Sequence, residues 1–167
     1  MSNYTVLNNK VREYKNFISE AEAAGLVAYL EQNDGGRGNI NLLKLDTLPA
    51  MVESVKARVM VEIKDISGDQ DEALENKVLK LWKHPHGAST RPKSYGNFAF
   101  MLYLNDQYEG GEFIVPSQNI SIKPDALSLF VFETGDEYGV DAVDAGTKYS
   151  MGGAFEWPNT TGPDGAR

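Results

Sequence analysis

Short apolar segments separated by turn residues dominate the second half of the chain and restrict its fold more than any other feature. Between residues 77 and 155 they recur at 78–82, 97–104, 112–115, 119–122, 127–132 and 148–155. Turn-forming pairs separate them, among them Asn105-Asp106, Gly110-Gly111 and Pro124-Asp125. Evenly spaced short strands of this kind are typical of a β-sandwich or a β-barrel.

The first third of the chain reads as helical. Ser19 and Glu22 form a capping box, which predicts a helix over 19–32. A second helix is predicted over 48–64, with Pro49 in its first turn, where the missing N–H does no harm. Its apolar residues recur every three or four positions and should face the sheet: Val52, Val55, Val59 and Ile63.

The composition favours an ordinary globular protein and excludes several partners. Of the 167 residues, 41% are hydrophobic and 24% are charged, and the net charge is −8, so no basic surface for nucleic acid or anionic membranes is expected. The absence of cysteine excludes disulfides and thiolate metal sites. The polar N-terminus carries no recognisable signal peptide, and we expect a soluble protein, cytoplasmic or part of a virion.

The strand region resembles a known family. Residues 98–106 read FAFMLYLND and are followed by an acidic-Gly-Gly turn at 109–112 and by Pro116, a succession found in prolyl-4-hydroxylase-like 2-oxoglutarate/Fe(II) dioxygenases. Residues 122–130 and 138–150 resemble two further strands of that family. The resemblance implies an α+β fold, a double-stranded β-helix or jelly-roll barrel supported by N-terminal helices. We expect one domain over 1–157 and a polar tail over 158–167.

The resemblance also predicts that the iron site is incomplete. The family binds iron through two histidines and one carboxylate. In this chain His86 takes the place of the first ligand, but Ala88 stands where the carboxylate would be and Tyr138 where the second histidine would be. Halogenating relatives carry a small residue like Ala88 and bind chloride there, yet they still need the distal histidine.

Other ligand sets remain open at this point. His84 and His86 are two residues apart, so on a strand they would point the same way. Three acidic residues near Tyr138 offer oxygen ligands: Asp136, Glu137 and Asp141. A His-Pro-His loop without metal is the interpretation we favour. Because a phenol keeps its proton at neutral pH, Tyr138 is expected to plug the barrel mouth, facing His86, and not to bind a metal.

The co-substrate end of the family site is better matched. Lys148 corresponds to the basic residue that pairs with the far carboxylate of 2-oxoglutarate, and Ser150 is placed to assist by hydrogen bonding. Tyr103 is a third candidate for this site. The alternative is a strand lysine that extends to solvent or pairs with an acidic neighbour.

Three functions are compatible with these residues. We favour a non-catalytic binding or structural module with protein partners or self-assembly, since function follows the site and the metal site is mostly missing. A viral or other multi-subunit assembly is one setting, suggested by the C-terminal tail together with the acidic, cysteine-free composition. The alternative is an active hydroxylase that uses Fe(II) and 2-oxoglutarate with non-standard ligands. A sugar-binding jelly roll would need exposed rim aromatics, for which Tyr108 and Tyr138 are candidates.

Overall fold

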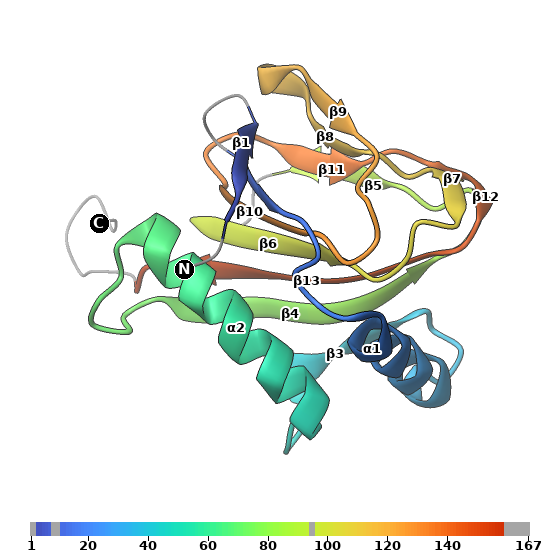
Figure 1. Cartoon of the computed structure of the whole chain (residues 1–167), viewed down its shortest axis with the longest axis horizontal. Helices are drawn as coiled ribbons and strands as arrows, with labels where there is room; N and C mark the ends of the chain where they lie inside the picture. Colours follow the sequence, from blue (N-terminus) through green and yellow to red (C-terminus); the bar gives the residue numbers. More distant parts are fainter. Residues whose placement is uncertain (1–2, 8–10, 94–95, 159–167) are drawn as a thin grey trace.

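A large antiparallel sheet forms the centre of the molecule (Figure 1). The computed structural model describes residues 3–7, 11–93 and 96–158. Across the sheet the strands follow the order β1 (Thr5–Leu7), β2 (Val11–Tyr14), β10 (Leu129–Glu133), β6 (Phe98–Tyr103), β13 (Lys148–Glu156), β4 (Glu75–His84) and β3 (Asn39–Asn41). The longest strands, β4 and β13, therefore lie side by side next to β6.

A smaller sheet covers one face of the large one. It has the order β5 (Thr90–Lys93), β11 (Tyr138–Val140), β8 (Phe113–Val115) and β9 (Ile120–Ile122), and it lies above the large sheet in Figure 1. A separate pair, β7 (Tyr108–Gly110) and β12 (Val143–Gly146), sits at one end, and two short 3₁₀ turns span Leu42–Lys44 and Pro116–Gln118. Two facing antiparallel sheets of this kind form the expected double-stranded β-helix, so the predicted fold class is confirmed.

Two helices cover the opposite face of the large sheet (Figure 1). The helix α1 (Glu20–Asn33) starts at the predicted capping box, in which Ser19 and Glu22 each accept a hydrogen bond from the other's backbone N–H. The helix α2 (Ala50–Ser67) ends at Gly68, whose φ of 73° is the left-handed conformation that favours glycine. Pro49 precedes α2 and does not lie within its first turn. Neither helix is long and apolar enough to cross a membrane, within the described residues.

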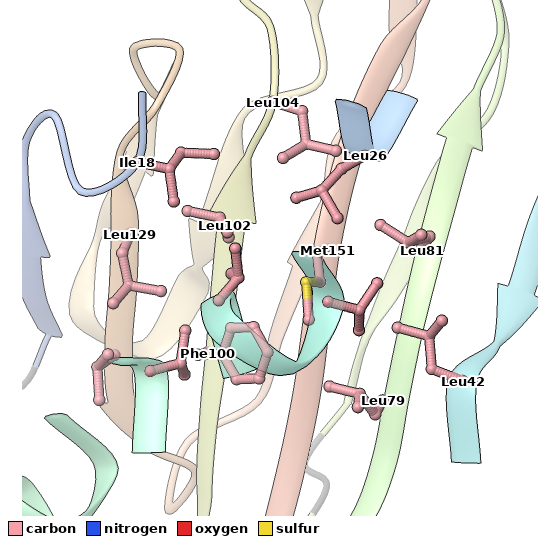
Figure 2. Packing of buried hydrophobic residues seen from close by; sticks show 14 of the residues in the cluster. Ile18, Leu26, Leu42, Leu79, Leu81, Phe100, Leu102, Leu104, Leu129 and Met151 are labelled. Atoms are coloured by element: carbon pink, nitrogen blue, oxygen red, sulfur yellow. The ribbon is translucent and has the colours of Figure 1, made fainter. Parts of the chain in front are cut away.

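One hydrophobic core lies between the helices and the large sheet (Figure 2). The predicted stripe of α2 is buried there, and every one of its members is at most 1% exposed: Val52, Val55, Val59 and Ile63. Alternate strand residues meet it, including Leu79 and Leu81 of β4, Phe100 and Leu102 of β6, and Met151 of β13. Burial of this stripe explains why α2 docks on the sheet.

A second core fills the space between the two sheets. It contains the other set of alternate residues of β6, namely Ala99, Met101 and Tyr103, together with aromatic residues of β8 and β10. The six residues of β6 are all buried, because the strand has a core on each face. This explains why residues 97–104 read as a nearly continuous apolar run and not as an alternating one.

The expectation that the first third is helical is wrong for three short strands. The strand β2 pairs with β10, with Tyr14 opposite Leu129, and β3 pairs with β4, with Ile40 opposite Leu81. The strand β1 forms the outer edge by pairing with β2. Segments of three or four residues are too short to show a two-residue period, and their pairing depends on strands far along the chain.

The buried stripe of α2 allows a matched test of this packing. Val55 is fully buried, whereas Val61 on the same helix is 61% exposed. We expect Val55→Thr to lower the free energy of unfolding by about 1–2 kcal/mol, because it places a hydroxyl in an apolar core. The control Val61→Thr, with the same change in helix propensity, should stay within about 0.5 kcal/mol. Urea unfolding of both variants measures the difference, and equal losses would contradict the docking of this face.

Candidate functional site: a buried lysine between the sheets

Strand register brings a set of polar side chains together between the two sheets. On β13, Lys148 lies opposite His84 of β4, and Ser150 lies opposite both Trp82 of β4 and Tyr103 of β6. Directly opposed residues of antiparallel strands point to the same face, which here is the face that carries the core between the sheets. The neighbouring strands β4, β13 and β6 thus place these side chains close together between the two sheets.

Several polar atoms of this set are buried and have no hydrogen-bond partner among the described residues. Lys148, Ser150 and Tyr103 are 0% exposed and Tyr108 is 3% exposed. Within the described part of the chain no hydrogen-bond partner exists for Lys148 Nζ, Ser150 Oγ, the hydroxyls of Tyr103 and Tyr108, or His84 Nδ1. An unpaired buried polar group costs about 1–3 kcal/mol, so such a group in a native structure calls for an explanation. We call these five residues the Lys148 cluster.

Direct contacts tie the cluster together. Lys148 Nζ lies 5.1 Å from the centroid of the Tyr103 ring, within range of a cation–π interaction. Gly111 lies between Tyr108 and Lys148, because a Cβ placed on it would be 3.0 Å from Tyr108 Cε1 and 3.3 Å from Lys148 Cδ. The φ of Gly111 is 67°, so both its conformation and its space favour glycine. The Gly-Gly turn seen in the sequence thus lets β7 approach the lysine.

Burial sets the charges of the cluster. It lowers the pKa of Lys148 to about 8, against a smaller opposing effect of Glu112. It also lowers the pKa of His84 to about 4, and the positive charge of Lys148 acts in the same direction. Burial raises the pKa of Tyr103 and of Tyr108, so both phenols keep their protons. At neutral pH the cluster is therefore a cation with phenol and hydroxyl donors, a set that suits the oxygens of an anion.

A cavity of about 320 Å³ adjoins the cluster at His84. Its wall includes the ring of Trp82, which stacks on His84 with centroids 6.3 Å apart and an interplanar angle of 23°. Most of the lining is apolar, from Val78, Met101, Phe113, Val140 and Ala154. Gly152 gives Trp82 room, because a Cβ there would lie 2.7 Å from the indole atom Cζ3. The glycine pair at 152–153 thus marks close approach of neighbouring groups.

Tyr138 lines a cavity together with a histidine, as the plug hypothesis expects, but the histidine is a different one. It lines the cavity from β11, and its ring packs at 4.7 Å on Phe132 and at 6.4 Å on Phe113. The histidine that shares this cavity is His84, not His86. The expectation that Tyr138 faces His86 is therefore wrong, and Tyr138 shares its cavity with His84.

The two histidines are separated by the end of β4. His84 is the last residue of that strand, and Pro85 begins a turn closed by a 3.0 Å hydrogen bond from the Ala88 N–H to its carbonyl. His86 is exposed within this turn, so the interpretation that both histidines share one strand face is wrong. Ala88 pairs through its backbone with Val143. Its proposed correspondence to the carboxylate position stays a prediction, as does the role of His86 as a ligand.

The residues present do not fit an iron triad. Among the residues that the structure describes, no group of three or more His, Cys, Asp or Glu side chains could hold a metal ion. Of the acidic residues considered near Tyr138, Glu137 and Asp141 are exposed and Asp136 accepts a hydrogen bond from Gln118. His84 provides one imidazole at the cavity, and within the described part of the chain the two further ligands that iron needs are not beside it.

Sequence reasoning misplaced Tyr108 and missed His84. The sugar-binding alternative needs Tyr108 at an exposed rim, but β7 turns it inward beside Lys148 and leaves it 3% exposed. His84 was considered only together with His86. The signal that identifies it is the register of β13 on β4, because Lys148 and His84 are direct partners.

Solved structures with the same architecture define the class of fold. A prolyl hydroxylase from Trichoplax adhaerens, in complex with a hypoxia inducible factor peptide, superposes with a TM-score of 0.71 at 15% identity and covers 89% of this chain and 84% of its own. The viral collagen prolyl hydroxylase of Paramecium Bursaria Chlorella virus-1, solved with 2OG, gives 0.69 at 14% identity over 87% and 94%. A Pseudomonas putida prolyl-4-hydroxylase gives 0.69 at 17% identity over 88% and 92%. The chain has the fold of the prolyl-4-hydroxylase-like 2-oxoglutarate/Fe(II) oxygenases.

Sequence comparison gives a shorter match. The chain is 33% identical over 85 residues to prolyl 3-hydroxylase 2 of Homo sapiens and, equally, of Rattus norvegicus. The match covers 47% of this chain and spans 11% of the length of those proteins. No family model matches the chain.

The lowered pKa of Lys148 predicts how stability depends on pH. Since the unfolded chain keeps this proton up to about pH 10.5 and the folded protein loses it near pH 8, the free energy of unfolding rises with pH in this window. Lys148→Met removes the buried charge and should be more stable than the parent at pH 7. We expect that advantage to shrink by about 2 kcal/mol between pH 7.5 and 9.5. Urea unfolding at both pH values measures it, and a constant difference would refute a buried, charged lysine.

Proposed function

We propose that this protein is a non-catalytic binding module that holds a small carboxylate at Lys148. The observation that carries the proposal is the fully buried ammonium of Lys148, which has no hydrogen-bond partner among the described residues. A carboxylate placed there would accept hydrogen bonds from Lys148, Ser150 and Tyr103, each of which is a donor. The ligand would thereby offset both the buried charge and the unpaired hydroxyls.

The energetics favour an anion over other occupants. A buried ammonium without a partner is costly, and charge-assisted hydrogen bonds to a carboxylate are about twice as strong as neutral ones. The nearest acidic influence on Lys148 is Glu112, which is half-buried and opposes the lowering of the lysine pKa only in part. A bound anion would therefore neutralise the positive charge of Lys148 that Glu112 offsets only in part.

The fold suggests which carboxylates to test first. The viral prolyl hydroxylase structure is described as a 2OG complex, and 2-oxoglutarate carries a carboxylate of the kind that Lys148 would hold. When bound, 2-oxoglutarate and iron together would supply oxidising chemistry. Here the donors fit only the carboxylate end, since His84 is one imidazole where two histidines and a carboxylate are needed. We therefore propose binding without an iron-dependent reaction.

The larger assembly of the protein stays a prediction. The polar tail that suggested a virion or another multi-subunit particle lies outside the described residues, apart from Pro158. The carboxylate site is built from β4, β6, β7 and β13 and does not depend on that setting.

Titration calorimetry on chelator-treated protein tests the proposed function. We expect at least one small carboxylate, from a series of acetate, glutarate, 2-oxoglutarate and 3-phenylpropionate, to bind without metal. Lys148→Met should weaken it at least tenfold by removing the cation. The control Lys44→Met, at an exposed lysine, should leave binding unchanged.

Two outcomes would overturn this function. Failure of every carboxylate to bind in a Lys148-dependent manner would remove the carboxylate site. Stoichiometric, tight Fe(II) binding with turnover of 2-oxoglutarate would instead establish the oxygenase alternative with non-standard ligands.

A further inference from the structure

The cavity next to the Lys148 cluster differs from the cluster in chemistry. The two regions meet along β4 and β13, where His84 lies opposite Lys148 and Trp82 lies opposite Ser150. His84 and Trp82 both line the cavity, so a ligand held at Lys148 and extended past these residues would enter it. The rest of such a ligand would then be surrounded by Met101, Phe113 and Val140.

This juxtaposition limits what the body of the ligand can be. A second carboxylate in the apolar part of the cavity would lose its hydration and face a neutral imidazole, at a cost of several kcal/mol for an unpaired ion. Lys80 is the lysine that lines the cavity. Its backbone lies four residues before His84 on β4, about 13 Å along the strand, so pairing with it requires a ligand that spans much of the distance between the two lysines. An apolar body, in contrast, gains from burial against these side chains.

We propose that the ligand is an amphipathic monocarboxylic acid, with its carboxylate at Lys148 and an aromatic or branched apolar body between Trp82, Met101 and Phe113. This inference rests on the proposed carboxylate site. The cavity volume of about 320 Å³ is enough for a small organic group. The volume lies at the small end of the range for ligand pockets.

The stacked pair of Trp82 and His84 suits an aromatic body. Their rings are stacked with an interplanar angle of 23°, and the edge of a ligand ring could pack on Trp82 as aromatic pairs do. His84 stays neutral at physiological pH because burial lowers its pKa to about 4, so an apolar body packed beside it buries no charge there. Lys148 would bind the carboxylate of any such acid, and the fit of the apolar part in the cavity would then decide which acid binds more tightly.

Titration calorimetry with ligands of nearly equal size compares their affinities, and it tests the apolar body of the ligand separately from the carboxylate site. We expect 3-phenylpropionate to bind at least tenfold tighter than glutarate and 2-oxoglutarate, and tighter than the uncharged 3-phenylpropanol by a similar factor. Val140→Phe narrows the cavity from β11, beside Phe113, and should weaken 3-phenylpropionate at least tenfold. The control Val61→Phe adds the same group at an exposed site on α2 and should not change it.

Each contrary result has a distinct meaning. If the dicarboxylates bind tighter than 3-phenylpropionate and still depend on Lys148, the apolar-body inference is wrong and the carboxylate site stands. If Val140→Phe folds, as its urea transition reports, and binds 3-phenylpropionate like the parent, the body does not occupy this cavity. If no carboxylate depends on Lys148, the proposed function fails and this inference fails with it.

Discussion

The ammonium group of Lys148 lies between two sheets, where water cannot reach it, and the arrangement around it follows from that constraint. A cation in this position raises the cost of folding unless its surroundings supply negative charge or hydrogen-bond acceptors. Its neighbours are the hydroxyls of Tyr103, Ser150 and Tyr108, which make no hydrogen bond among the described residues, with a half-buried Glu112 as the nearest acidic influence. A group of donors around one cation is the arrangement expected for a site that receives an anion.

The architecture explains how a short chain holds such a costly group. The strand β13 begins at Lys148 and is paired along its length with β4, and with β6 over much of it. One face of these strands packs on α1 and α2 through Leu81, Phe100 and Met151, and this core is independent of the polar one (Figure 2). The apolar core between the helices and the large sheet therefore supports the strands, and the face turned to the small sheet is free to carry polar groups.

The sequence was sufficient for much of this fold but not for the full site. Turn residues and apolar runs located the long strands, and the Ser19–Glu22 capping box located α1, because these signals are local. Lys148, Ser150 and Tyr103 were found through a family resemblance, and the register of β13 then brought them together. His84 and Tyr108 were not assigned, since the direction of each depends on where β4 ends and on how Gly111 lets β7 approach. Such features are set by tertiary contacts that no short window of sequence contains.

Nuclear magnetic resonance of the lysine Nζ and Cε nuclei tests the central claim most directly, because it reads the charge of Lys148 itself. Lys148→Met identifies the resonance. The account predicts that this lysine titrates near pH 8 in the free protein, and that a saturating carboxylate moves its titration upward by a pH unit or more. A Lys148 resonance that titrates near its ordinary value in the free protein, or one that no carboxylate shifts, would contradict it.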